Sequence, residues 1–420
     1  MDPQADRPPP DTFATSEPPL ASGPPPVPET EVLEVLEIDS APEDSAADSS
    51  IGTPTVGKYR LPNAGRALLW ILLLIGSQLV FAVLVVVVLA ATLMAGGEPQ
   101  VPQDLPSKIA EQERLFNRFL VPLATLLTLG VSLGVVLLTF RKETARCMGL
   151  RGMSLTQVAL VLLSVLPCAL LASEFTNCAS EVLPNISMDL FGDFAKESWW
   201  LVFVAACLFP GLGEELFFRG FLSRGLVAHH GVWLGTLITA FYFGAIHLHP
   251  IQACGAFALG IALQFVFLTT RSLWGAILLH TANNAVAFLA MRYGDLVPIP
   301  GFTWNSPVEP GVDGDPAPRY DLLVEAAQGT GAGTIVHTAP LLLLAATFAV
   351  AAIGWALLRT RTRWLRPDGT EWSPGFLSAE GPRPKVPVQT VASQLDGVTG
   401  SVIVLANVAF FATLYFHIQR

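Results

Sequence analysis

The sequence is poor in charged residues. Asp, Glu, Lys and Arg make up only 14% of its 420 residues, whereas hydrophobic residues make up 52%. Soluble globular proteins carry about 25% charged residues, so this deficit excludes an ordinary soluble domain. Long apolar runs are present instead, for example within residues 67–95, and about 20 apolar residues are enough to cross the core of a bilayer. The composition therefore predicts an all-α, polytopic transmembrane helical bundle.

Two further absences narrow the class of protein. The five cysteines contain no CxxC pair, which favours buried, small hydrophobic side chains over a disulfide framework or a zinc site. They are Cys147, Cys168, Cys178, Cys207 and Cys254. The N-terminus has neither a basic segment nor an early apolar stretch, so we expect no cleavable signal peptide. Membrane insertion is therefore expected to rely on the first apolar span.

The acidic residues are concentrated in residues 1–57. This segment holds twelve Asp or Glu and a single Arg. Its net charge, 1 − 12 = −11, is thus more negative than the net charge of the whole chain, −10. It is rich in Pro and Ser and buries too little apolar surface to offset the entropy of ordering, so we expect a disordered tail. The rest of the chain is almost neutral, which disfavours nucleic-acid binding and leaves membrane lipid as the expected partner.

The apolar runs predict about eight membrane spans, with a shorter ninth. Their predicted positions are 67–94, 119–140, 155–173, 199–226, 232–249, 252–270, 272–291 and 335–358, and the ninth is 398–416. Lys and Arg gather before the first span, after the second and after the eighth, whereas the loops before the fourth span and after the seventh are acidic. Because cytoplasmic loops are enriched in Lys and Arg, we expect the N-terminus on the inside.

These patterns divide the chain into five parts. They are an acidic, Pro-rich cytoplasmic tail at 1–57, two N-terminal spans within 58–154, a core of five spans at 155–291, an extracytoplasmic loop at 292–334, and a C-terminal part with one or two spans and a basic cytoplasmic linker at 335–420.

Charged groups within membrane spans are costly and usually functional. The first such group in this chain is the segment Glu214-Glu215-Leu216-Phe217-Phe218-Arg219. Glu215 and Arg219 are four residues apart and can pair on one helix face, which leaves Glu214 about 100° around the helix. The preceding run, residues 210–213 (Pro-Gly-Leu-Gly), is expected to break or kink the helix. The alternative is a helix end at the membrane interface, where Glu and Arg are ordinary.

Two further motifs place imidazole and amide groups at helical spacing. Phe243 and His247 share one face, and His280 and Asn284 share another. Taken singly, such a His is usually an interfacial group, and such an Asn often joins helices. Glu214 and His247, however, lie 17 and 16 residues from Gly231, so an antiparallel hairpin would bring them to the same depth. His280, near the start of its span, is expected to lie somewhat shallower.

These groups suit hydrolysis of a carbonyl compound. A Glu and a His held away from bulk water can bind and deprotonate a water molecule, and a second His with an amide donor suits the developing oxyanion. Glu214, His247 and His280 also match the ligand types of a catalytic zinc ion, although the HExxH signature is absent. Zn²⁺ is thus an alternative cofactor, while the metal-free interpretation leaves Glu214 as the base.

The three motifs resemble those of the CPBP family of intramembrane proteases, which includes the CAAX prenyl endopeptidases and bacteriocin-processing relatives. That family shows EExxxR, FxxxH and HxxxN on successive membrane helices, and the resemblance covers about residues 155–291. Here the motifs read Glu214-Glu215-xxx-Arg219, Phe243-xxx-His247 and His280-xxx-Asn284.

The resemblance implies a role for each of these residues. Glu214 and His247 would activate water, and His280 and Asn284 would support the oxyanion. The remaining motif residues, Glu215, Arg219 and Phe243, would support the structure. The expected partners are membrane lipid and a membrane-associated protein or peptide substrate.

We therefore predict an intramembrane endopeptidase, of the metalloprotease or glutamic type, that hydrolyses a peptide bond of a membrane-associated protein or peptide, for which a prenylated CAAX-type protein is one candidate. Two other classes stay open. A non-catalytic membrane scaffold or immunity-type protein would tolerate Glu214→Gln. A proton or cation transporter also uses intramembrane Glu and His, but inverted repeats would favour it, and the sequence shows none. The expected location is a bacterial inner membrane.

A reporter fused near Asp313 tests the predicted orientation. Because the acidic loop 292–334 follows the seventh span, we expect the reporter to behave as an extracytoplasmic domain. Cytoplasmic behaviour at this position, with a reporter at residue 151 as the cytoplasmic control, would show that the orientation is wrong.

Overall fold

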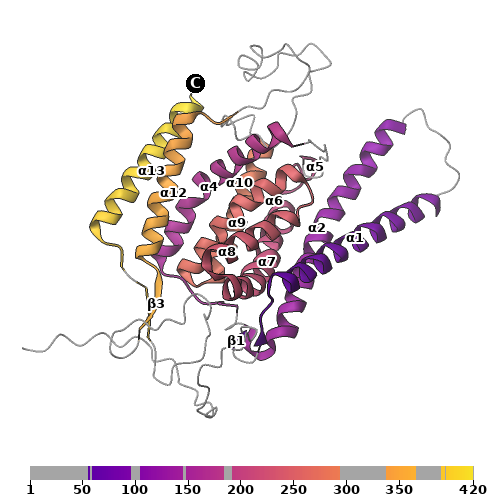
Figure 1. Ribbon diagram of the computed structural model, residues 1–420. Coiled ribbons are helices and arrows are strands. Elements are labelled where there is room, and N and C mark those ends of the chain that lie inside the picture. The colour runs from indigo at the N-terminus through magenta and orange to yellow at the C-terminus, as the bar shows by residue number, and fades with distance from the viewer. Residues whose placement is uncertain are drawn as a thin grey trace, which may run out of the picture. The chain divides into compact units, whose positions relative to one another are not determined.

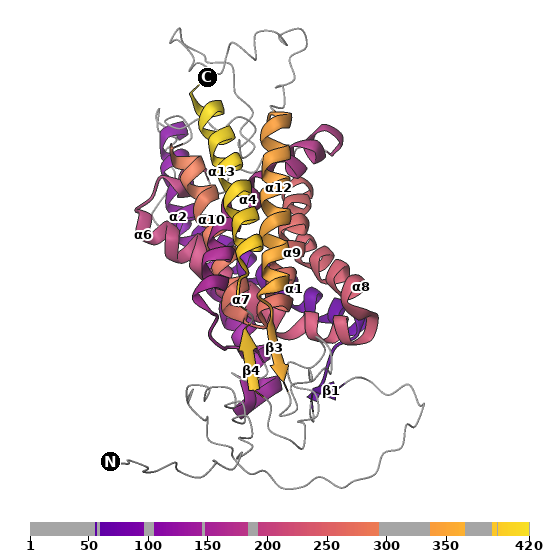
Figure 2. The same cartoon turned by 90° about the vertical axis from the view of Figure 1, so that its left-hand side faces the viewer.

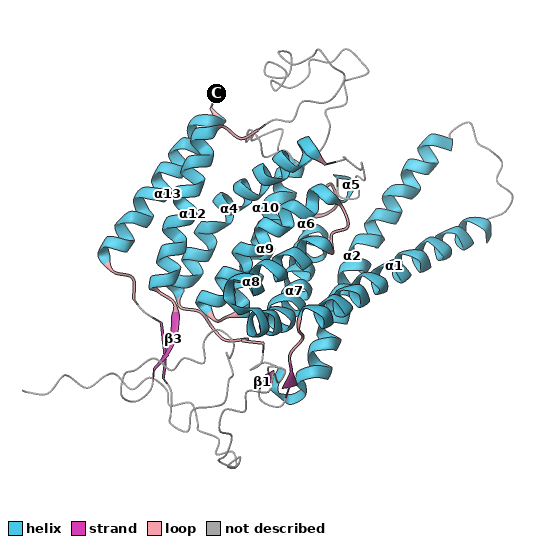
Figure 3. Ribbon diagram, in the orientation of Figure 1, coloured by secondary structure: helices cyan, strands magenta, loops and turns pink. Residues whose placement is uncertain are grey.

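Apolar runs in a bilayer form helices because each backbone polar group must be hydrogen-bonded within the chain. In the computed structural model, the described residues are 55–56, 59–95, 105–144, 148–183, 192–293, 337–365, 389–392 and 394–419. They belong to the unit Gly52–Arg420, and the separate unit Met1–Ile51 lies outside them. Helices dominate the described part of the chain (Figure 3).

Eight helical runs among the described residues are long and apolar enough to cross a membrane. Seven are single helices: α1 (Ala64–Ala95), α2 (Leu105–Phe140), α4 (Leu155–Val182), α9 (Pro250–Thr270), α10 (Leu273–Tyr293), α12 (Pro340–Arg359) and α13 (Gly397–Ile418). The eighth run, Trp199–Ala245, comprises α6 (Trp199–Val202), η2 (Phe203–Leu208), α7 (Phe209–Glu215), η3 (Leu216–Leu222) and α8 (Ser223–Ala245). This confirms the polytopic helical fold, including the ninth predicted span as α13.

The run Trp199–Ala245 contains the fourth and fifth predicted spans. Its backbone leaves the helical region at Gly231, where φ is 78° and ψ is 172°, a conformation that glycine adopts without steric cost. The chain turns back there: a Cβ added at Gly235 would lie 2.6 Å from the Cα of Val227. Eight residues of straight helix would separate these positions by about 12 Å. The predicted turn is therefore present within α8.

The helices pack in an order that differs from their order in the chain. α13 packs against α12, α12 against α4, and α4 against both α9 and α10. On the other side of the bundle α2 packs against α7, and α1 packs against α2 (Figure 1). The run Trp199–Ala245 and helices α9 and α10 thus lie between the first two helices and the last two.

Two short hairpins lie in the segments outside the long helices. Thr55–Val56 (β1), at the end of the predicted tail, pairs with Tyr59–Arg60 (β2), and residues 1–54 lie outside the described residues. The linker after α12 contains β3 (Thr362–Leu365), which pairs antiparallel with β4 (Gln389–Ala392) (Figure 2). Backbone hydrogen bonding between strands orders these short pieces. The loop 292–334 lies outside the described residues beyond Tyr293.

The cysteines agree in part with their predicted burial. Cys207 is buried, Cys168 and Cys254 are partly buried, and Cys178 is exposed. Cys147 lies outside the described residues. Cys178 is exposed because α4 extends to Val182, nine residues past the predicted end of the third span.

The turn in α8 predicts a steric test. In Gly235→Ala the new Cβ would lie 2.6 Å from Val227 Cα and 2.7 Å from Val227 N, both backbone atoms of the opposing arm. We expect overpacking to lower the free energy of unfolding by about 1–3 kcal/mol, measured by thermal unfolding in detergent.

Gly130→Ala is the matched control for this test. A Cβ there has no neighbour within 4 Å, and alanine favours the helix, so its stability should equal or exceed that of the unchanged protein. Equal stability of Gly235→Ala and Gly130→Ala would mean that the two arms do not approach as described.

Candidate functional site

The segment that carries Glu214, Glu215 and Arg219 is a widened helix rather than a broken one. We expected residues 210–213 to interrupt it, but α7 continues through them, flanked by the π-helical turns η2 and η3. At the start of α7 the N–H of Phe209 reaches back five residues to the carbonyl of Val204. Such π-turns re-pair backbone groups around a proline and occur often at functional sites.

The Glu215 carboxylate is fully buried and contacts two side chains, those of Arg219 and His280. Its Oε1 lies 2.7 Å from Arg219 Nη1 and 2.8 Å from His280 Nδ1. Arg219, also fully buried, donates from Nη2 to the carbonyl of Gly260 at 2.9 Å. The pairing of Glu215 with Arg219 follows the predicted spacing, and its link to His280 ties the widened helix to α10.

Phe243 lies at the centre of the aromatic and cationic groups. The guanidinium of Arg219 lies 4.5 Å from its ring centroid, a cation–π distance. Edge-to-face contacts place the ring centroids of His247 and His280 5.4 Å and 5.6 Å away. Phe243 is buried, so it separates the ion pair from His247 and fixes both imidazole rings by packing.

The two histidines each use Nδ1 for a hydrogen bond within the protein. His247 Nδ1 lies 2.9 Å from the carbonyl oxygen of Phe243, which can only accept. His280 Nδ1 lies 2.8 Å from the Glu215 carboxylate, which also accepts. Each Nδ1 therefore carries a proton. Nε2 is the nitrogen that remains for chemistry at both residues.

Glu214 and Asn284 are less constrained. Glu214 is partly buried, and its Oε2 is shielded from solvent and makes no hydrogen bond to any described residue. Asn284 donates one amide hydrogen to the carbonyl of Ala206 at 3.2 Å. An amide nitrogen carries two hydrogens, so the second remains available.

A cavity of about 200 Å³ brings the predicted catalytic residues together. Glu214, His247, His280 and Asn284 all line it, and so does Phe243, whereas Glu215 and Arg219 do not. The remaining wall is mostly apolar, with contributions from Ala169 and Ala172 of α4. His280 thus reaches the same cavity as Glu214, although its position in the sequence predicted a shallower depth.

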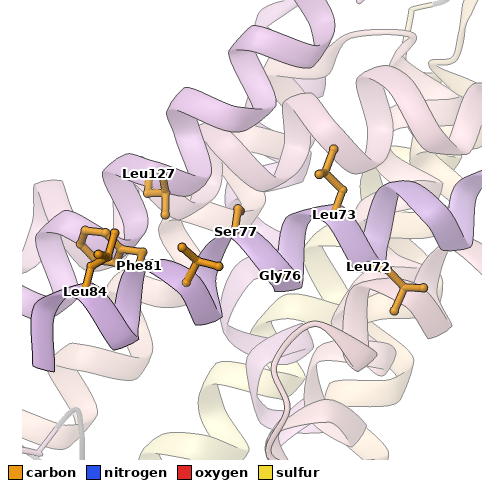
Figure 4. Close-up of a pocket in the computed structure, with 8 residues that line it drawn as sticks. Leu72, Leu73, Gly76, Ser77, Phe81, Leu84 and Leu127 are labelled. Carbon is orange, nitrogen blue, oxygen red and sulfur yellow. The ribbon is translucent and has the colours of Figure 1, made fainter. Parts of the chain in front are cut away.

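A second groove on the protein differs from this cavity in the residues that line it. It is an open groove of about 540 Å³ along α1 and α2, lined by Leu72, Leu73, Gly76, Ser77, Val80, Phe81, Leu84 and Leu127 (Figure 4). No titratable side chain lines it, and much of α1 exposes apolar residues such as Val80 and Leu84. Such a surface suits contact with lipid chains, so the cavity that Glu214, His247 and His280 line is the candidate active site.

Sequence reasoning missed two features of the cavity. The bond between Glu215 and His280 joins residues 65 positions apart, and neither motif indicates the partner of the other. Val121 and Thr125 of α2 line the cavity, although they lie outside residues 155–291. Thr125 is a polar residue within an apolar predicted span, and this was the feature of the sequence that could have indicated its place in the cavity.

The residues predicted as zinc ligands do not fit one ion as they are placed. Nitrogen and oxygen ligands lie at about 2.0–2.2 Å from zinc, so two of them can be at most about 4.4 Å apart. Among the described residues, the ligand atoms that meet within 4.8 Å belong to a different set, Glu174, Cys178 and His337. Glu214, His247 and His280 do not form such a group as they are placed, and their role as zinc ligands stays a prediction.

Comparison with known proteins confirms the family resemblance. Residues 196–286, less than a quarter of the chain, match the family model described as type II CAAX prenyl endopeptidase Rce1-like. The matched segment contains all three motifs and supports a multi-pass membrane peptidase of CAAX type. No curated protein matches the chain, and no solved structure does.

Removal of Arg219 should destabilise the fold. Arg219→Ala leaves the Glu215 carboxylate buried without its cation, and breaking a buried pair in this way costs about 3–5 kcal/mol. We expect low abundance in membranes and a lower temperature of unfolding in detergent.

Arg118→Ala is the control for this prediction. Arg118 pairs with Glu197 at 3.5 Å, but its side chain is 52% exposed, and exposed pairs contribute about 0–1 kcal/mol. If the two variants are equally stable, the Glu215–Arg219 pair does not support the structure.

Proposed function

We propose that this chain, whose residues 196–286 match the Rce1-like CAAX peptidases, is an intramembrane endopeptidase that uses a Glu- and His-activated water. The observation that carries the proposal is the convergence of four groups on one largely apolar cavity: Glu214, His247, His280 and Asn284. Its proposed substrate is a membrane-associated protein, and a prenylated CAAX-type C-terminus is the first to test.

The water is held between Glu214 and His247. The Oε2 atom of Glu214 has no hydrogen-bond partner among the described residues, so it is available to accept a proton. His247 presents Nε2, because its Nδ1 faces the Phe243 carbonyl. A water that donates one hydrogen to each of these acceptors has an oxygen lone pair left for attack on a carbonyl carbon.

Bond formation and proton transfer balance at Glu214. As the water oxygen bonds to the carbonyl carbon of the scissile peptide, the Glu214 carboxylate takes one water proton and the carbonyl oxygen becomes an oxyanion. When the carbon–nitrogen bond breaks, the protonated Glu214 delivers that proton to the leaving amine. A single carboxyl group thus serves first as base and then as acid.

The oxyanion is placed near Asn284 and His280. The second amide hydrogen of Asn284 is a neutral donor, oriented by the bond from Nδ2 to the Ala206 carbonyl. His280 donates from Nε2 when its ring is doubly protonated, while Glu215 accepts from Nδ1. Donors oriented before the reaction stabilise the developing charge without reorganisation.

Replacement of the cavity residues tests these roles. Glu214→Gln, His247→Ala and His280→Ala should each abolish cleavage at near-normal abundance, because each removes a cavity-lining group with a proposed role in the reaction. Asn284→Ala should reduce the rate by about 10²–10³, the usual loss for one oxyanion donor. The measurement is mass-spectrometric mapping of cleavage products, in membranes and with a prenylated CAAX peptide.

Glu197→Gln is the matched control, because it makes the same chemical change at a carboxylate outside the cavity. It should cleave normally. If Glu214→Gln also cleaves normally, the water-activation mechanism is wrong and a scaffold role is favoured.

A further inference from the structure

A cluster of metal-ligating side chains lies at the end of α4, apart from the candidate active site. Glu174, Cys178 and Glu181 are spaced four and three residues apart, so they share one face of this helix. His337, three residues before the start of α12, lies against that face. The cluster therefore joins two segments that are more than 150 residues apart in the chain.

The ligand atoms are close enough to surround one ion. Glu174 Oε1 lies 2.7 Å from His337 Nδ1 and 4.0 Å from Cys178 Sγ. All three atoms lie within 4.8 Å of one another. Zinc–sulfur bonds of about 2.3 Å and zinc–oxygen or zinc–nitrogen bonds of about 2.0–2.2 Å allow such separations after small side-chain movements.

Neighbouring groups already orient two of the ligands. The backbone N–H of Thr338 donates to Glu174 Oε2 at 2.8 Å, and Asn177 Nδ2 donates to the same oxygen at 3.2 Å. Glu174 Oε1 is thereby directed at Cys178 and His337. His337 Nε2 lies 2.9 Å from Glu181 Oε1, and a carboxylate on the far nitrogen is the usual orienting partner of a metal-bound histidine.

The mixture of donors selects the metal. Calcium and magnesium prefer all-oxygen sites, whereas a thiolate, an imidazole and a carboxylate together suit zinc. We propose that Glu174, Cys178 and His337 bind a zinc ion that clips the end of α4 to the start of α12. Glu181 orients His337, and water completes the coordination.

The clip supports a wall of the candidate active site. Ser173 and Thr176, on either side of Glu174, line the catalytic cavity. Fixing this end of α4 fixes the position of that wall. The metal does not take part in the reaction, which separates this site from the zinc alternative at Glu214, His247 and His280.

Zinc titration of the full-length protein in detergent, after removal of metals with a chelator, tests the proposal. We expect one equivalent of zinc to bind, to slow maleimide labelling of the exposed Cys178, and to raise the temperature of unfolding. His337→Ala should lose all three effects, and Cys178→Ser, which has no thiol to label at this position, should lose the binding and the rise in unfolding temperature. Glu181→Gln should bind zinc about 10- to 100-fold more weakly.

Two control variants separate failure of the zinc proposal from failure of the proposed peptidase mechanism. Cys254→Ser removes another free cysteine and should leave zinc binding unchanged. His247→Ala, inactive under the proposed function, should bind the same single equivalent. Labelling of Cys178 that zinc does not slow, or zinc lost in His247→Ala and kept in Cys178→Ser, would overturn the proposal without bearing on the water mechanism.

Discussion

The Glu215 carboxylate is the group on which the rest of the candidate site depends. It is fully buried, pairs with Arg219 one turn along its own helix, and accepts from His280 of α10. Arg219 in turn donates to the Gly260 carbonyl of α9. An unpaired charge at this depth would be costly, so the three segments hold one another in a single arrangement, with His280 turned toward the cavity.

Two adjacent glutamates can then have opposite environments. Residues i and i+1 on a helix point about 100° apart, so Glu215 faces its charged partners while Glu214 faces the cavity. The π-helical turns on either side of α7 keep the backbone paired through Pro210. Gly213 allows a close approach, since an added Cβ would lie 2.9 Å from the Cα of Leu129 on α2. Backbone packing thus sets the depth of Glu214.

The sequence predicted the features that depend on local spacing. Glu215 and Arg219 at i and i+4 are paired, and the apolar runs form the expected helices. It could not predict which helices pack together, so the bond from Glu215 to His280 and the cluster around His337 were invisible. Residues 210–213 were expected to break or kink the helix, and they do not break it, because π-helical turns flank α7 and keep the backbone paired around Pro210.

The unpaired polar atoms suggest how the cavity is organised for chemistry. Glu214 Oε2 and Asn283 Oδ1 both belong to cavity-lining residues and are buried without a partner among the described residues. Each such atom costs about 1–3 kcal/mol, a cost that is offset when a water or a substrate amide pairs with it. Within this cavity, these two oxygens are therefore the acceptors that a water molecule or a peptide amide would pair with. The buried contacts of Glu215 and Arg219 hold the surrounding helices around them, because they join the widened helix to α10 and α9.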